Sequence, residues 1–271
     1  SNGSVAPPAT LAMFNTTLSR GGLSCTVLAT EKLTGLDIQY AAEISFDGVI
    51  EMSNAVGGVS VCLATNINDK FVGLNLPAGE QTIEGETALA FLRSRHGVGD
   101  GSDLGRISDQ QLFMSSLMRT LSSAGVLSNP LTLYKLANAA VTNMQLSDTL
   151  TAPTTMVAIA LALKNISLSN VVFVEYPTKS NPAYPGRVVP EQPADNILNS
   201  ALDNDQPVLL SGKLGRATVA GPAIAATPAP GSTATPTTTA TSSPSVSAVA
   251  LPADVTGQTA AQQTCARAYR P

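Results

Sequence analysis

The sequence predicts an α/β protein that ends in a disordered tail, and two observations support this. Between residues 23 and 63, patterns typical of a helix, a strand, a second helix and a second strand follow one another, which indicates a layered α/β architecture rather than a helix bundle. Residues 221–247 are almost entirely Ala, Pro, Thr, Ser and Gly, which bury too little apolar surface to offset the entropy lost on ordering. The remaining length is ample for a hydrophobic core.

The first elements are marked by clear boundary signals. A helix is expected over residues 23–33, ended by Gly35 at its C-terminal cap. Residues 36–46 alternate apolar and polar side chains with a period of two, the clearest strand pattern in the chain. Asp47 is expected to cap a short helix that stops at the pair Gly57–Gly58.

The middle of the chain contains two helices joined by a glycine-rich loop. Thr82 is expected to cap a helix that runs to residue 92, and the loop follows at residues 97–101. Asp103 then begins a long helix that reaches residue 122, with apolar residues at helical spacing. The other expected elements are a strand at residues 59–63, a loop at 64–79, helices at 130–143, 148–164 and 191–202, and a strand at 171–176.

Charge and composition exclude some classes of protein. The formal net charge is −4 with 15 basic residues, which argues against a protein that binds nucleic acid through a broad basic surface. No apolar stretch is long enough to cross a bilayer, and residues 1–9 contain no signal peptide. Either the protein is cytoplasmic, or its export and anchor segment lies outside this sequence.

The cysteines leave two alternatives open. No pair of cysteines has metal-ligand spacing, and the single histidine, His96, cannot complete a common zinc site. The thiols are either buried and inert, or Cys25 and Cys62 form a disulfide in an oxidising compartment and leave Cys265 unpaired in the tail.

Residues 91–111 are the stretch richest in possible chemistry. If the chain is extended after the first of these helices, Arg93 and Arg95 project to the same side. Asp103, Arg106 and Gln110 are spaced i, i+3, i+7, so they share one face of the long helix. Arg119 follows further along the same helix.

Two interpretations of this polar cluster remain open. Arginine suits phosphate because its planar guanidinium makes paired, charge-assisted hydrogen bonds and keeps its proton, and Asp103 with a second acid could hold Mg²⁺. Alternatively, the charges form a solvated face, with Asp103 and Arg106 as a surface ion pair.

Several ordered blocks of sequence resemble the LytR-CpsA-Psr family, in the form typical of actinobacteria such as mycobacteria. The blocks are Gly57-Gly-Val-Ser-Val, Leu76-Pro-Ala-Gly, Gly85-Glu-Thr-Ala-Leu-Ala-Phe-Leu-Arg-Ser-Arg-His, Asp103-Leu-Gly-Arg and Gln110-Gln. The resemblance is close over residues 23–118, looser to residue 202, and absent from residues 1–20. Asp109 stands where family members usually have arginine.

The resemblance implies a fold and an activity. The expected fold is a mixed central sheet flanked by helices, an α/β/α sandwich with a lipid-binding cavity. The expected activity is Mg²⁺-dependent transfer of a glycan, such as teichoic acid, capsular glycan or arabinogalactan, from a polyprenyl pyrophosphate carrier to peptidoglycan. The alternatives are a polyprenyl pyrophosphatase and a non-catalytic lipid-binding or regulatory module.

The resemblance also assigns residues, domains and location. Arg93, Arg95, Asp103 and Arg106 are the expected catalytic residues. The arginines bind pyrophosphate together with Gln110 and Arg119, and Asp103 is the expected Mg²⁺ ligand. Residues 21–218 are the expected catalytic domain, preceded by an N-terminal remnant at 1–20 and followed by a disordered tail at 219–271. Removal of residues 221–271 should leave the melting temperature nearly unchanged. The expected location is the cell envelope outside the cytoplasm, with the family's membrane anchor and early strands outside this chain.

Overall fold

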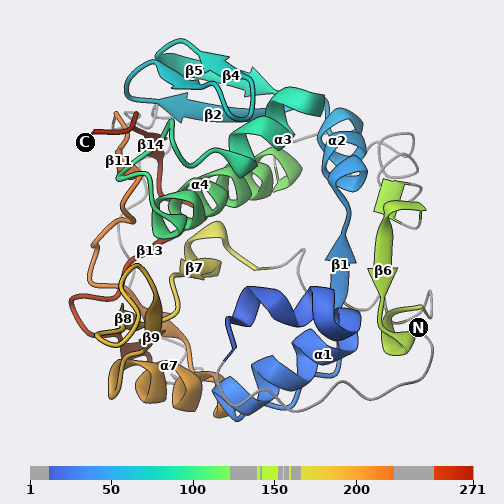
Figure 1. Cartoon of the computed structure of the whole chain (residues 1–271), viewed down its shortest axis with the longest axis vertical. Helices are drawn as coiled ribbons and strands as arrows, with labels where there is room; N and C mark the ends of the chain where they lie inside the picture. Colours follow the sequence, from blue (N-terminus) through green and yellow to red (C-terminus); the bar gives the residue numbers. More distant parts are fainter. Residues whose placement is uncertain are drawn as a thin grey trace, which may run out of the picture.

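The computed structural model describes residues 12–122, 139–140, 142–151, 155, 159, 166–222 and 247–270. Within these ranges the chain forms a mixed α/β fold, with a four-stranded sheet and two helices at one end and smaller pairs of strands with further helices at the other (Figure 1). No helix in these ranges is both long enough and apolar enough to cross a membrane.

The central sheet joins strands from the two ends of the chain. Its order is β11–β14–β2–β5, with β14 parallel to β2 and the other two pairings antiparallel. The strands are β2 (Val59–Leu63), β5 (Gly79–Ile83), β11 (Thr218–Ala220) and β14 (Thr264–Ala266). The sheet is mixed, as the family resemblance implied.

Two helices cover one face of this sheet (Figure 1). They are α3 (Gly85–Arg93) and α4 (Asp103–Ser122), and they also pack against each other. Alternate residues of β2 are buried beneath them, and Phe91 of α3 lies 6.5 Å from Phe113 of α4 between ring centroids. Ser60, on the opposite face of β2, is exposed.

The N-terminal part forms a separate layer. A 3₁₀ turn (Phe14–Thr16) leads into α1 (Thr17–Thr34), which ends at Gly35 in the left-handed conformation. Short β1 (Ala42–Ile44) pairs antiparallel with β6 (Met144–Leu146), and α2 (Phe46–Ala55) then leads into the central sheet.

A second apolar cluster lies at the other end of the molecule. It packs α7 (Ala194–Asp203) against β10 (Val208–Leu209) and β12 (Val249–Ala250), through buried Leu198 and Leu251. The remaining strands are β3 (Ile67–Asp69), β4 (Leu74–Leu76), β7 (Val172–Val174), β8 (Thr178–Ser180), β9 (Val188–Pro190) and β13 (Gly257–Thr259). Two 3₁₀ turns complete the set, Asp148–Leu150 and Leu168–Asn170.

Several elements agree with the sequence patterns. The strand at residues 59–63, the long helix at 103–122 and the cap at Gly35 are confirmed. Gly57 and Gly58 both have positive φ and end the short helix as expected. The strand at 171–176 and the helix at 191–202 are present in shortened or shifted form as β7 and α7. Most of the helices expected at 130–143 and 148–164 lies outside the described residues.

Other local expectations are wrong. Only Ala42–Ile44 of the long strand pattern at 36–46 is a strand, because within the described residues only the three-residue β6 pairs with it. Thr82 does not cap a helix but pairs with Ser60 in the central sheet, and α3 begins after Glu84. The side chain that caps α2 is Ser45 rather than Asp47.

The loop expected at 64–79 and the boundary at residue 20 are also wrong. The pair β3–β4 forms an antiparallel hairpin within residues 64–79. Residue 20 lies inside helix α1, so it separates no N-terminal remnant from the rest of the chain.

The expectation of a disordered tail at 219–271 is wrong for residues 247–270. Residues 223–246, where the Ala/Pro/Thr composition is strongest, lie outside the described residues. Residues 247–270 contain β12, β13 and β14, and β14 is an inner strand of the central sheet with Ala266 fully buried. A domain boundary at 218 would cut this sheet, so the domain includes residues 247–270.

The disulfide expected between Cys25 and Cys62 is wrong as well. Cys62 is bonded to Cys265, because β14 lies directly beside β2 and places these residues opposite one another, with 4.4 Å between their Cα atoms. Cys25 lies in α1 as a free thiol.

Candidate functional site

Asp69, at the end of β3, organises the turn that carries Arg95. Its side chain is almost fully buried, and Oδ2 accepts a hydrogen bond from the hydroxyl of Ser94 at 2.8 Å. The same oxygen accepts from the backbone N–H groups of Arg95, His96 and Gly97, at 3.0–3.1 Å. Asp69 therefore fixes the backbone conformation that positions Arg95. The sequence patterns missed this role because its partners lie more than twenty positions away along the chain.

These hydrogen bonds control the ionisation of Asp69. Burial is the largest single influence and opposes the charged form, but the donors from Ser94 and the backbone together outweigh it and lower the pKa of Asp69 below the ordinary 3.8. The carboxylate therefore contributes stability above the unfolded-state pKa, and this contribution is lost as the pH falls through the lower folded-state value.

We expect Asp69→Asn to lower the free energy of unfolding by about 2–4 kcal/mol at pH 7, because a neutral amide replaces a carboxylate that accepts several N–H groups. The difference from the unsubstituted protein should shrink below pH 3.8. Chemical denaturation at pH 7 and below pH 3.8 measures this difference in the free energy of unfolding, with Asp203→Asn at an exposed position as the control. Equal stability of Asp69→Asn and the unsubstituted protein at pH 7 would show that the turn does not depend on this carboxylate.

The ion-pair cluster itself consists of Arg95, Asp103 and Arg106. Asp103 is the first residue of α4, whose start is capped by the hydroxyl of Ser102. Its Oδ1 lies 3.3 Å from Nε of Arg95 and 3.1 Å from an NH2 nitrogen of Arg106. Both guanidinium groups are partly exposed, and the structure thus brings together three of the four residues expected to be catalytic.

Arg93 lies apart from these pairs. It ends α3, and its guanidinium carbon is 4.7 Å from the ring centroid of Phe46 in α2, a cation–π contact. Phe46 is itself exposed, so Arg93 lies at the surface between α2 and α3. Its expected catalytic role stays a prediction.

Gln110 and Arg119 make contacts that hold elements together. Nε2 of Gln110 donates to the carbonyl of Leu92, tying α4 to the end of α3. The guanidinium of Arg119 donates to the carbonyls of Ala260 and Gln262, so it fixes the C-terminal segment on α4. Burial lowers the pKa of Arg119, and the nearby charge of Glu80 opposes this shift. Their expected substrate-binding roles stay predictions.

Asp109 is a buried acid whose side chain is unpaired within the described part of the chain. It lies in α4, fully buried, and neither carboxyl oxygen has a hydrogen-bond partner among the described residues. Burial raises the pKa of Asp109 well above the ordinary 3.8. The folded state keeps this proton while the unfolded state loses it, so the contribution to stability is present below pH 3.8 and is lost as the pH rises towards the folded-state pKa.

We expect Asp109→Asn to remove this penalty. At pH 8 the variant should melt at least about 3 °C above the unsubstituted protein, and at pH 4 the gap should be smaller. Thermal unfolding of both proteins at both pH values measures the difference in melting temperature. The effects of the other titrating groups cancel because both proteins contain them. A constant gap, or a lower melting temperature at pH 8, would contradict a neutral buried acid.

Two hollows are lined by residues that lie close along the chain to the cluster or contact its loop. A mainly apolar groove of about 410 Å³ runs along α4 and β7, and its lining includes Ile107, Met114 and Phe173. Gln110 also lines it, one helical turn from Arg106, so the groove begins beside the cluster.

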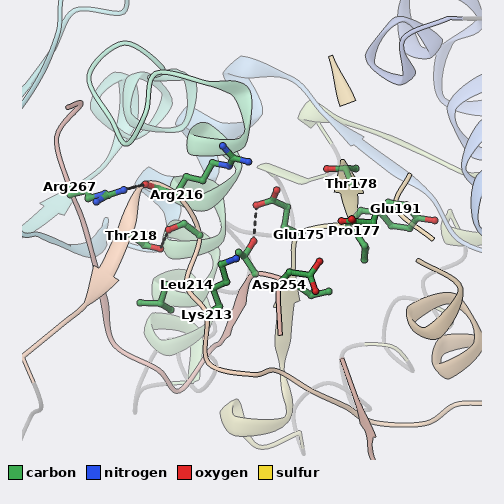
Figure 2. Close-up of a pocket in the computed structure, with 14 residues that line it drawn as sticks. Glu175, Pro177, Thr178, Glu191, Lys213, Leu214, Arg216, Thr218, Asp254 and Arg267 are labelled. Carbon is green, nitrogen blue, oxygen red and sulfur yellow. Dashed lines mark hydrogen bonds between the residues drawn. The ribbon is translucent and has the colours of Figure 1, made fainter. Parts of the chain in front are cut away.

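The second hollow is a polar pocket of about 440 Å³, drawn in Figure 2. Arg216, in its lining, makes an ion pair with Asp100 at 3.1 Å. Asp100 lies on the loop between Arg95 and Asp103 and also accepts hydrogen bonds from Ser102. Burial is again the largest influence on Asp100 and favours its neutral form, but these donors and Arg216 outweigh it and lower its pKa.

The described residues contain no group of three or more His, Cys, Asp or Glu side chains placed to hold a metal ion. Mg²⁺ is commonly bound by one or two carboxylates, with substrate phosphates and water completing its shell. Asp103, about half exposed and paired through Oδ1, fits the part of one such ligand.

The chain folds as an α/β protein, and its paired arginines lie beside an apolar groove. This arrangement suits a phosphate ligand that carries an apolar tail. The chain belongs to the LytR_cpsA_psr family, whose sequence model matches residues 4–201. The match begins near the start of the chain, so the expectation that residues 1–20 fall outside the family is wrong.

Named relatives belong to cell-wall assembly. The chain is 36% identical over 152 residues to the cell wall biosynthesis protein LcpA of Corynebacterium glutamicum, covering 56% of this chain and 28% of that protein. It is 30% identical over 137 residues to the polyisoprenyl-teichoic acid–peptidoglycan teichoic acid transferase TagV of Bacillus subtilis, covering 49% of this chain and 34% of TagV. The matched region thus spans about a third of each relative.

A solved structure shares the fold. The LytR-Csp2A-Psr enzyme from Actinomyces oris superposes with a TM-score of 0.58 at 22% identity, covering 72% of this chain and 75% of that one. At this identity the likeness concerns the fold, and it confirms the expected arrangement of a mixed central sheet with helices.

Proposed function

We propose that this chain transfers a glycopolymer from a polyprenyl pyrophosphate carrier to peptidoglycan during cell-wall assembly at the envelope. Family membership and relatives named for cell wall biosynthesis and teichoic acid transfer support the proposal. The observation that carries it is the pair of guanidinium groups, from Arg95 and Arg106, held side by side by one carboxylate of Asp103.

The cluster suits the charge of a pyrophosphate. Arginine stays protonated, and two neighbouring guanidinium groups bind phosphate oxygens through charge-assisted hydrogen bonds. Nε of Arg95 already lies 3.3 Å from Oδ1 of Asp103, whereas Nε of Arg106 is buried and has no hydrogen-bond partner among the described residues. Because an unsatisfied buried donor is costly, Nε of Arg106 favours an incoming acceptor oxygen.

The apolar groove supplies the second half of the recognition. A polyprenyl chain is a hydrocarbon, and the groove lined by Ile107, Met114 and β7 begins one helical turn from Arg106. A carrier with its pyrophosphate on the arginines would therefore find apolar surface for its tail along α4.

In the proposed reaction a sugar hydroxyl of peptidoglycan attacks the glycan-bearing phosphorus. A new oxygen–phosphorus bond forms, the bond between the glycan-bearing phosphorus and the bridging oxygen breaks, and polyprenyl phosphate leaves with the bridging oxygen and the electron pair. The hydroxyl proton passes to water. Arg95 and Arg106 bind the oxygens on which charge increases, and such donors contribute most in the transition state.

Asp103 orients both guanidinium groups and is the residue that would hold Mg²⁺ with the substrate phosphates. When bound, Mg²⁺ supplies positive charge to the phosphate oxygens.

A transfer assay tests the proposal. A polyprenyl-pyrophosphate-linked saccharide and peptidoglycan oligomers are mixed with the protein, and the product is followed by mass spectrometry. We expect a phosphodiester-linked product with Mg²⁺ and a loss of at least about 100-fold with excess EDTA, restored by added Mg²⁺. Release of polyprenyl phosphate without linkage would instead identify a pyrophosphatase, and no change in the substrate would contradict both activities.

A further inference from the structure

We propose that the polar pocket beside the arginine cluster binds the peptide-bearing part of the peptidoglycan acceptor. This rests on the proposed transferase function and assigns its second substrate to a place. The pocket, called here the acceptor pocket, has a volume of about 440 Å³, within the range of small-molecule sites. Its charged lining residues are Glu175, Glu191, Lys213, Arg216, Asp254 and Arg267.

Three of these six charged side chains already make hydrogen bonds or ion pairs that hold the walls of the pocket. Arg216 pairs with Asp100, and Nε and NH2 of Arg267 donate to the carbonyl of Arg216 at 3.1 and 2.7 Å. Glu175 accepts a hydrogen bond from the hydroxyl of Thr256 at 2.8 Å. In Figure 2 one dashed line joins Arg267 to Arg216 and another starts from Glu175. Such prior pairing fixes the walls before a ligand arrives.

The other charges remain available to a ligand. Lys213, Glu191 and Asp254 make no side-chain hydrogen bond or ion pair within the described part of the chain, and Lys213 and Asp254 are exposed. The pocket therefore offers one free ammonium group and two free carboxylates. A polyphosphate would meet uncompensated carboxylates, so the pocket is a poor second phosphate site.

A ligand with both signs of charge matches this set. Peptidoglycan carries short peptides with free carboxylates and, in many forms, a free amino group, attached to an amino sugar. Its carboxylate can pair with Lys213 and its ammonium group with Asp254 or Glu191. The sugar next to the peptide is the part that carries acceptor hydroxyl groups.

The position of the pocket relative to the cluster supports an acceptor role. The ion pair between Arg216 and Asp100 joins the pocket wall to the loop that precedes Asp103. The same wall touches α4, because a Cβ added at Gly215 would clash with the hydroxyl oxygen of Ser108. A molecule in the pocket is thus next to, but separate from, the arginines that bind the donor.

Isothermal titration calorimetry with a soluble disaccharide–tetrapeptide, carrying a free amino group and free carboxylates, tests the proposal on the full chain. We expect saturable binding, weakened at least about tenfold by Lys213→Glu and by Asp254→Lys. The matched controls Lys70→Glu and Asp203→Lys change exposed charges outside the pocket and should bind as the unsubstituted protein does. The same disaccharide without its peptide should bind more weakly.

The outcomes separate this proposal from the proposed function. Arg106→Ala should bind the disaccharide–tetrapeptide normally while losing transfer. Unchanged binding by Lys213→Glu and Asp254→Lys, or weakening equal to that of the controls, would overturn the acceptor pocket and leave transfer intact. A loss of donor affinity alone in these variants would also overturn it, since the pocket would then hold the donor glycan.

Discussion

Replacing Cys265 with Ser lowers the free energy of unfolding by about 2–5 kcal/mol, the usual cost of losing a native disulfide. The bond spans a sequence separation of 203, so it removes a large part of the conformational freedom of the unfolded chain. It also joins two neighbouring strands of the central sheet, β2 and β14. Denaturant unfolding of the oxidised protein measures the loss.

The control for this prediction is Cys25→Ser, which removes the free thiol in α1 and should change stability by less than about 0.5 kcal/mol. Reduction of the unsubstituted protein should reproduce the Cys265→Ser result. Equal stability of Cys265→Ser and the unsubstituted protein would show that β14 is held without the disulfide.

The packing of the C-terminal segment contradicts the expectation, drawn from composition, that its removal leaves the melting temperature nearly unchanged. Removing residues 221–271 should lower the melting temperature markedly, because β14 is an inner strand and Gln258 is buried against α4. Nε2 of Gln258 donates to the carbonyl of Gln111 and the hydroxyl of Ser115, at 3.2 and 2.7 Å. Truncation would remove these buried hydrogen bonds and take an inner strand out of the sheet.

Replacing Arg106 with Ala reduces transfer by at least about 100-fold while the protein stays folded. The side chain is 35% exposed, so its loss leaves no large cavity. Its guanidinium is expected to bind the phosphate oxygens on which charge increases, and one such donor contributes about 100- to 1,000-fold in comparable sites. Transfer kinetics measured beside circular dichroism spectra check both halves of the prediction.

Two further variants sharpen the Arg106 experiment. Arg106→Lys keeps the charge but not the planar pair of donors, so it should recover only part of the activity. Arg187→Ala removes an exposed arginine outside the cluster and should transfer normally. Full activity in Arg106→Ala would remove this residue from the site.

Sequence patterns predicted the elements whose structure depends on near neighbours. The apolar spacing of α4, the acid in its first turn, and the glycines after α1 and α2 all act within a few residues. The long alternation at 36–46 predicted a strand that is longer than the one observed. A strand also needs a partner of matching length, and its own sequence does not specify that partner.

The candidate site was predictable in part. The spacing of Asp103 and Arg106 on a helix predicts their ion pair directly, and the motif around Arg95 places it nearby. The role of Asp69 and the pairing of Cys62 with Cys265 depend on strands brought together from distant parts of the chain, which spacing alone does not reveal. The low-complexity composition of residues 221–247 also gave no indication that the segment after it, which contains β12, β13 and β14, is ordered.

In the proposed function, the cluster of Arg95, Asp103 and Arg106, with its apolar groove, binds a polyprenyl pyrophosphate. Native mass spectrometry of the full chain with added polyprenyl pyrophosphate and Mg²⁺ tests this most directly. We expect a one-to-one complex that Arg187→Ala retains and that Arg106→Ala loses at the same ligand concentration. Absence of any complex, or equal binding by Arg106→Ala, would contradict it.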